Sequence, residues 1–124
     1  MKLIFTEKAP SPAGHYSQAI VSGGLVFVSG QLPIHPESGE IKPTIEEQTH
    51  QVMKNLEYIL LASGSSLGKV VKATLYISDI SLWNKVNAIY AEHFGSHKPA
   101  RAVVPTRDLH FGCLIEVEVV AELA

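Results

Sequence analysis

The chain has 124 residues, a length that suits one domain over residues 1–124. Apolar residues make up 46% and charged residues 18%, which is a globular composition and excludes an intrinsically disordered chain. The formal net charge is −2 and no run of Lys or Arg occurs, so no nucleic-acid partner is expected, because phosphate neutralisation dominates such binding.

The first half of the chain predicts three strands, two of them paired, and a helix. Apolar runs at 19–21 and 25–28 are separated by two glycines, which is typical of a tight β-hairpin. Thr44 and Glu47 fit a capping box at the start of the helix, and Gly64 is a natural end for it. One apolar stripe follows the helix, formed by Ile45, Val52, Met53, Leu56, Ile59 and Leu60.

The second half predicts three strands and a second helix. Alternation predicts a strand over residues 71–78, a helix is expected over 81–94, and two strands follow over 100–104 and 114–121. Four residues of the first of these strands are expected to share one side: Val71, Ala73, Leu75 and Ile77. The complete order, three strands followed by helix, strand, helix and two strands, indicates one sheet with both helices on one face.

The other face of that sheet is the open question. On the last strand, Ile115, Val117 and Val119 suit a helix-covered core. The opposite side carries Leu114, Glu116, Glu118 and Val120. Such a face is either solvated or packed against another subunit, where a carboxylate needs a partner, and the pattern leaves both alternatives open.

Two kinds of charged residue are candidates for chemistry. Arg101 stands among small and apolar residues on a short strand, where it could hold a carboxylate or simply be an exposed edge arginine. Glu116 and Glu118 project from one face of their strand and could divide acid and base roles, or be solvated. Tyr16 and the Ser29-Gly30 pair could approach a ligand, or anchor a loop and a bend.

Metal and thiol chemistry are not expected. His93 and His97 have i, i+4 spacing, but a glycine lies between them and no HExxH motif surrounds them. Cys113 is the single cysteine, which excludes an internal disulfide. It stands three residues from His110 and is expected to be buried and inert. No membrane-spanning stretch or signal peptide is recognised, so the expected compartment is the cytoplasm.

Several segments, in this order and spacing, resemble the RidA family over nearly the whole chain. They are Ala9-Pro10, Gly14-His15-Tyr16-Ser17-Gln18-Ala19, Val26-Phe27-Val28-Ser29-Gly30-Gln31-Leu32-Pro33, Glu47-Gln48-Thr49, Val70-Val71-Lys72-Ala73-Thr74-Leu75, Val86-Asn87-Ala88-Ile89-Tyr90, Pro99-Ala100-Arg101 and Ile115-Glu116-Val117-Glu118.

The resemblance implies a chorismate-mutase-like α+β fold, with a single mixed sheet and two helices on one face. It also implies a homotrimer in which three sheets form a central barrel with ligand clefts between subunits. Arg101 would bind the substrate carboxylate and Glu116 would position the attacking water. The same cleft would be lined by Tyr16, Ser29, Gly30 and Asn87.

The implied activity is that of a 2-iminobutanoate/2-iminopropanoate deaminase. Such a hydrolase converts reactive enamine or imine acids, such as 2-aminoacrylate, to 2-keto acids and ammonia, and it needs no cofactor or metal. Two alternatives stay open: a non-catalytic regulatory protein that binds a small ligand on the same fold, and a ribonuclease or translation inhibitor. His15, Val103 and Pro105 depart from the common family pattern and leave the preferred substrate open.

Overall fold

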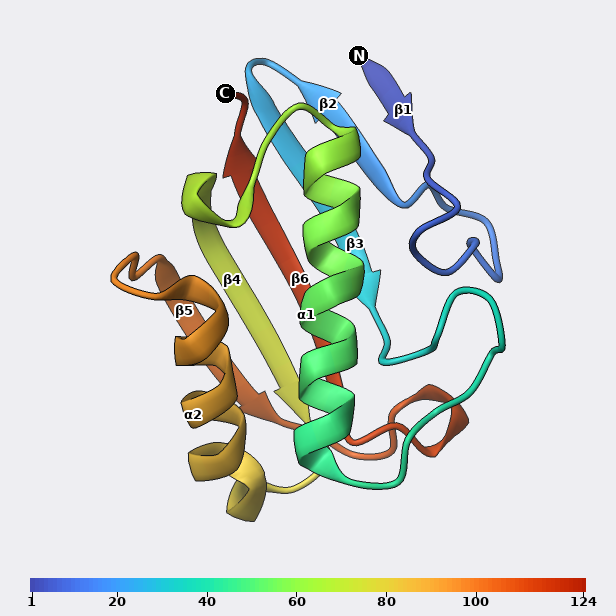
Figure 1. Cartoon of the computed structure of the whole chain (residues 1–124), viewed down its shortest axis with the longest axis vertical. Coiled ribbons are helices and arrows are strands. Elements are labelled where there is room, and N and C mark those ends of the chain that lie inside the picture. The colour runs from blue at the N-terminus through green and yellow to red at the C-terminus, as the bar shows by residue number, and fades with distance from the viewer.

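The computed structural model describes all 124 residues and contains one sheet and two main helices (Figure 1). The strands are β1 (Lys2–Ile4), β2 (Ala19–Ser22), β3 (Leu25–Gln31), β4 (Val70–Ile77), β5 (Ala100–Pro105) and β6 (Ile115–Glu122). The helices are α1 (Ile45–Ala62) and α2 (Trp83–Phe94), with short 3-10 turns η1 (Leu67–Lys69), η2 (Ile80–Leu82) and η3 (His110–Gly112).

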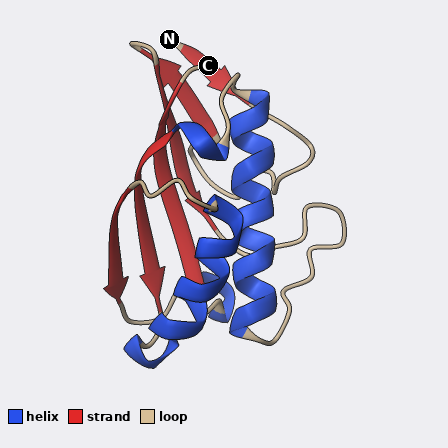
Figure 2. Cartoon of the chain, turned by 60° about the vertical axis from the view of Figure 1, so that its left-hand side comes forward, coloured by secondary structure: helices blue, strands red, loops and turns tan.

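The six strands form one mixed sheet in the order β1-β2-β3-β6-β4-β5. Strands β4 and β5 run parallel, as their connection through α2 requires, and all other neighbours are antiparallel. Figure 2 shows both helices on the same side of the sheet, while its other side carries no helix. The predicted α+β fold, with one mixed sheet and two helices on one face, is confirmed.

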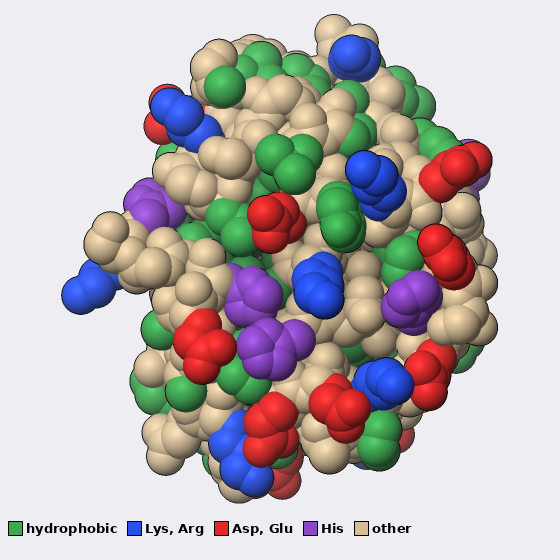
Figure 3. Space-filling model, in the orientation of Figure 1, with side chains coloured by type: hydrophobic (Ala, Val, Ile, Leu, Met, Phe, Trp, Pro, Cys, Tyr) green, Lys and Arg blue, Asp and Glu red, His purple; other side chains and the backbone are tan.

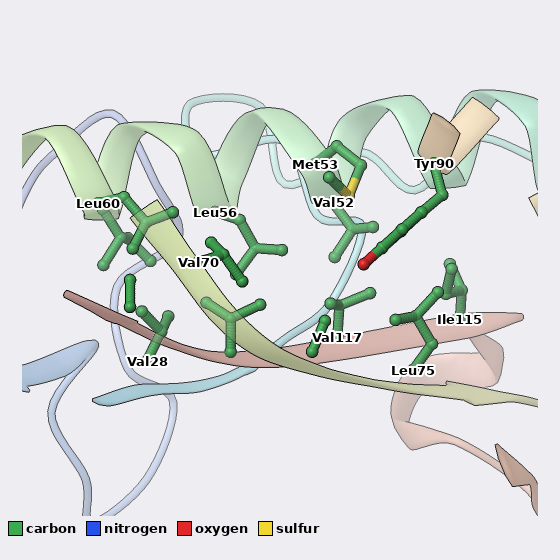
Figure 4. Close-up of a cluster of buried hydrophobic side chains, with 14 of the residues drawn as sticks. Val28, Val52, Met53, Leu56, Leu60, Val70, Leu75, Tyr90, Ile115 and Val117 are labelled. Carbon is green, nitrogen blue, oxygen red and sulfur yellow. The ribbon is translucent and has the colours of Figure 1, made fainter. Parts of the chain in front are cut away.

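The core lies between the helices and the sheet. The stripe predicted on α1 is buried along its whole length, and it faces Val70 and Leu75 of β4 and Val117 of β6 (Figure 4). Val70, Leu75 and Val117 are 0% exposed, and burying them under α1 drives the two layers together. Neither main helix has the length and apolar character that would let it cross a membrane.

Local signals explain how the elements begin and end. Gly23 and Gly24 both have positive φ, as the tight turn between β2 and β3 requires. The Thr44 hydroxyl accepts the backbone N–H of Glu47 and donates to the Glu47 carboxylate, so the predicted cap of α1 is present.

One prediction about β4 is wrong. Val71 was expected to share one side with Ala73, Leu75 and Ile77, but it is 39% exposed, and Val70 is buried instead. The pairing of β4 with β6 shifts register between Val70 and Lys72, and this bulge turns one residue outward at the start of the strand. Beyond the bulge, Ala73, Leu75 and Ile77 face the core as predicted.

Candidate functional site

Arg101 lies on the edge strand β5 and extends toward α2. Its Nη1 donates a hydrogen bond of 2.8 Å to Oδ1 of Asn87. Its guanidinium carbon lies 4.8 Å from the centroid of the Tyr90 ring and 5.5 Å from that of Trp83. Two aromatic rings and one amide therefore hold the guanidinium in place, through cation–π and hydrogen-bond contacts.

The Arg101 guanidinium has no carboxylate partner. The only ion pairs of the structure join Lys42 to Glu40 and Lys85 to Glu46, both at the surface. Arg101 is half-buried, unlike the exposed edge arginine that was the alternative. It lines a cleft of about 450 Å³ with Asn87, Tyr90, Ala91, Phe94, Gly95, His97, Lys98 and Pro99. A held, half-buried cation beside an open cleft is suited to bind an anionic group.

A second hollow, of about 290 Å³, lies where β3 and β6 meet. It is lined by Tyr16, Ser29, Gly30, Leu32, His110 and Glu116. The β3–β6 pairing shifts register between Val28 and Gln31, which places Ser29 and Gly30 on the irregular segment. A Cβ at Gly30 would overlap Oε2 of Glu116, so only glycine leaves room for this carboxyl group.

Glu116 and Glu118 have different surroundings in spite of their shared face. Glu118 accepts a hydrogen bond of 2.8 Å from the Tyr76 hydroxyl, whereas Glu116 has no hydrogen-bond partner in the chain. Burial raises the pKa of the Glu116 carboxyl, repulsion from Glu118 raises it further, and His110 acts in the opposite direction. A free carboxylate with a raised pKa is a stronger base than an ordinary carboxylate, so it is suited to take a proton from water and return it.

The predicted site residues therefore fall into two groups within one chain. Tyr16, Ser29, Gly30 and Glu116 share one hollow; Arg101 and Asn87 share the other. The Tyr16 hydroxyl accepts a hydrogen bond of 3.2 Å from the backbone N–H of Ala13. The Ser29 hydroxyl donates one of 2.6 Å to the backbone carbonyl of Ser17.

The two groups lie on opposite faces of the sheet. Arg101 contacts side chains of α2, so it is on the helix-covered face. Glu116 alternates with Ile115 and Val117, which are 0% exposed beneath the helices, so it points to the helix-free face. One chain alone does not bring the two charged groups to a common ligand.

The histidines and the cysteine that were considered from the sequence do not form a further site. His93 bonds to His50 at 2.9 Å between the helices, and His97 donates to the Val70 carbonyl at 2.7 Å, so the two residues do not converge. Cys113 is 1% exposed, and burial together with the Glu116 charge raises the pKa of its thiol.

Of the departures from the family pattern, His15 is exposed next to Tyr16. Val103 packs against the core, on the same side of β5 as Arg101. Pro105 ends β5 opposite Ile77, at an edge where a missing N–H costs little.

Sequence reasoning missed three residues around these hollows. Tyr90 lines the Arg101 cleft, and the Trp83 ring lies 5.5 Å from the Arg101 guanidinium carbon. Trp83 lies four residues before Asn87 and Tyr90 three residues after it, so all three share one face of α2. This spacing is the sequence signal that could have identified the two aromatic residues. His110 lines the Glu116 hollow, and no local pattern indicated this, because the loop that carries it had no predicted conformation.

Comparison with known proteins places this arrangement in a family. The sequence model of the endoribonuclease L-PSP family matches residues 6–123. A RutC family protein of Pyrococcus abyssi is 50% identical over 121 residues, which cover 97% of this chain and 95% of that protein. The chain belongs to the RidA/YjgF/RutC family. The predicted family is confirmed.

Members of the RidA family include proteins named for a deaminase. The chloroplastic Reactive Intermediate Deaminase A of Arabidopsis thaliana is 42% identical over 123 residues, covering 98% of this chain and 66% of that protein. RidA of an Antarctic Psychrobacter matches with a TM-score of 0.96 at 35% identity, covering 99% of this chain and all of that one. Escherichia coli TdcF, solved with bound serine, matches with a TM-score of 0.96 at 32% identity over the whole of both chains.

Proposed function

We propose that this protein hydrolyses reactive enamine and imine acids, such as 2-aminoacrylate and 2-iminopropanoate, to 2-keto acids and ammonia. Arg101 binds the substrate carboxylate and Glu116 positions the water. The observation that carries the proposal is the half-buried Arg101 guanidinium, which has no anionic partner in the chain. A carboxylate can form two parallel hydrogen bonds with such a group.

The relatives support a small acid as the ligand. A relative 42% identical to the chain is named a reactive intermediate deaminase, and TdcF was solved with serine, an amino acid that offers a carboxylate. The imine carbon is already electrophilic, so the protein needs to hold the substrate and move protons. The free Glu116 carboxyl, with its raised pKa, suits the second task.

We further propose that the site lies between subunits of a homotrimer. Arg101 and Glu116 project from opposite faces of one sheet, so a site that contains both needs two chains. The helix-free face carries apolar side chains that a partner would cover, among them Phe27 at 46% and Val104 at 39% exposure. Leaving large apolar side chains in water is unfavourable, and a symmetric partner would bury them.

The experiment is keto-acid formation from imines generated in solution by a pyridoxal-phosphate enzyme, with several imino acids compared. The proposed function predicts that catalytic amounts of the protein speed keto-acid release above the uncatalysed rate. Sedimentation at micromolar protein should give the mass of a trimer, and a stable monomer would contradict the shared site.

The same assay separates the alternatives. A regulatory ligand-binding protein would bind pyruvate or serine without speeding hydrolysis. A ribonuclease would degrade RNA, but the helix-bearing face shows basic and acidic side chains interspersed, without a continuous basic patch (Figure 3). The net charge of −2 also disfavours binding to phosphate backbones.

A further inference from the structure

The turn η3 brings a titratable side chain to the Glu116 hollow that the proposed function has not used. His110 and Glu116 line the same hollow, together with Tyr16 and Gly30. A smaller hollow beside it is lined by Tyr16, Gly30, His110 and Phe111 as well. We propose that His110 is a second proton-transfer residue of the proposed imine hydrolysis, acting on the substrate nitrogen while Glu116 acts on the water. This inference rests on the proposed function.

The backbone of η3 has an unusual conformation that holds the imidazole in place. Phe111 is the only non-glycine residue of the chain with positive φ, at φ 60° and ψ 21°. For a bulky residue this conformation costs about 1–2 kcal/mol. It lets the Phe111 ring stack on the His110 ring, with centroids 3.8 Å apart and planes 8° from parallel. Backbone strain of this kind is concentrated at functional sites, where it fixes a side chain in a working position.

The charges around the hollow favour separate acid and base roles for His110 and Glu116. Burial and Glu118 raise the pKa of the Glu116 carboxyl, whereas the charge of His110 lowers it, so the two groups interact electrostatically. Tyr16 is the other titratable residue that lines the hollow. The Cys113 thiol is buried and does not line it, but the Glu116 charge acts with burial to raise the pKa of this thiol. Arg107 and Asp108 belong to the same loop but do not line the hollow. A carboxyl group and an imidazole that line one hollow can divide the roles of base and acid between them.

The proton transfers balance over one turnover. The Glu116 carboxylate takes a proton from water as the water oxygen bonds to the imine carbon. The π pair of the C=N bond moves to nitrogen, which takes the proton of the His110 imidazolium. In the resulting carbinolamine, the Glu116 carboxyl gives its proton to nitrogen, the C–N bond breaks with its electron pair leaving on ammonia, and neutral His110 takes the hydroxyl proton. The keto acid forms, and both residues return to their starting states.

The test is the pH dependence of kcat/KM for the wild-type protein and for His110→Gln. Wild type should show a bell-shaped profile, because Glu116 must be ionised and His110 protonated. His110→Gln should lose the alkaline limb of the profile and about ten- to a hundredfold of the maximal rate, while binding of pyruvate is retained. The matched control is His50→Gln, which removes an exposed imidazole that contacts His93 of α2 and does not line the Glu116 hollow, so it should leave the profile unchanged.

A second variant separates proton transfer from charge alone. His110→Lys keeps a cation beside Glu116 but does not release its proton in the neutral range. We expect it to be as slow as His110→Gln; full recovery by lysine would overturn a proton-transfer role. If wild type hydrolyses imines and His110→Gln keeps the wild-type profile, the inference about His110 is wrong and the proposed function stands. If wild type does not speed imine hydrolysis at all, the proposed function itself is contradicted.

Discussion

Arg101 and Glu116 project from opposite faces of the same sheet, one toward α2 and the other toward the side without helices. Strand order adds to the separation, because Arg101 is on the edge strand β5 while Glu116 is two strands away on β6. Residues that the family resemblance assigns to one cleft are thus divided between two hollows of a single chain. A second subunit that presents its own Glu116 hollow to the Arg101 cleft would reunite them.

Replacing Arg101 with alanine should abolish carboxylate binding and leave the fold intact, since the side chain makes one hydrogen bond and two ring contacts. Loss of a charged bidentate contact should cost about a hundredfold or more in kcat/KM. Arg101→Lys should recover little of the lost kcat/KM, because an ammonium group cannot form the two parallel hydrogen bonds that the planar guanidinium makes with a carboxylate. Arg107→Ala is the control, since that exposed arginine lines neither hollow. Circular dichroism would verify folding alongside pyruvate titration.

Gly30→Ala should impair turnover more than stability. The added Cβ would overlap Oε2 of Glu116, and the carboxyl group at the end of its flexible side chain would swing away. The expected result is at least a tenfold fall in kcat, as for a displaced proton-transfer group, with a melting temperature near that of wild type. Gly68→Ala is a matched control, because a Cβ there would meet only the Ser66 hydroxyl at 3.8 Å. Unchanged kcat for Gly30→Ala would argue against Glu116 as the group that positions water.

Tyr90→Phe should stabilise the protein. The Tyr90 hydroxyl is the only buried side-chain polar group without a hydrogen-bond partner, and it points into the apolar cluster (Figure 4). Removing a buried, unpaired hydroxyl should raise the free energy of unfolding by about 1 kcal/mol, while the ring contact with Arg101 is kept. Tyr76→Phe, which removes the donor to Glu118, should give no such gain. Urea unfolding of both variants measures the difference, and a destabilised Tyr90→Phe would indicate an unrecognised partner for this hydroxyl.

His93 should make stability depend on pH below neutrality. Burial and the neighbouring His50 lower the pKa of His93 from its usual 6.5, with Lys54 adding and Glu57 and Glu92 opposing. The unfolded chain therefore binds a proton at a pH where the folded chain does not, so stability is full above pH 6.5 and falls as the pH drops toward the lowered value. His93→Gln should flatten this slope in thermal melts. A slope that stays the same would assign the pH dependence to other groups.

The sequence predicted the fold well because its signals were local. The glycine pair of the β2–β3 turn, the cap at Thr44 and the apolar stripe of α1 each act within a few residues, and all three are present. The orientation of Val71 could not be predicted, because the bulge beside it arises from pairing with β6, which is distant in the chain. The same holds for His110, whose place at the hollow depends on the strained Phe111 and on the meeting of β3 with β6.

The candidate site shows a similar division. The residue types were found from the sequence and the family resemblance, but their separation onto two faces was not. It follows from the register of β5 against β4, which puts Arg101 beside Ala73 on the core side, and from the alternation of β6. The sequence segments around Arg101 and Glu116 do not reveal how β5 is aligned with β4 or which face of the sheet each side of β6 occupies.

The most direct test of the shared site mixes two inactive variants, Arg101→Ala and Glu116→Gln, in one oligomer by co-expression or joint refolding. Each variant keeps the group that the other lacks. In a trimer with sites between subunits, about a quarter of the sites in a randomly assembled one-to-one mixture combine an intact Arg101 with an intact Glu116. We therefore predict that imine hydrolysis returns to about a quarter of the wild-type rate on mixing. A mixture that assembles into mixed trimers and stays as inactive as its two components would contradict the account.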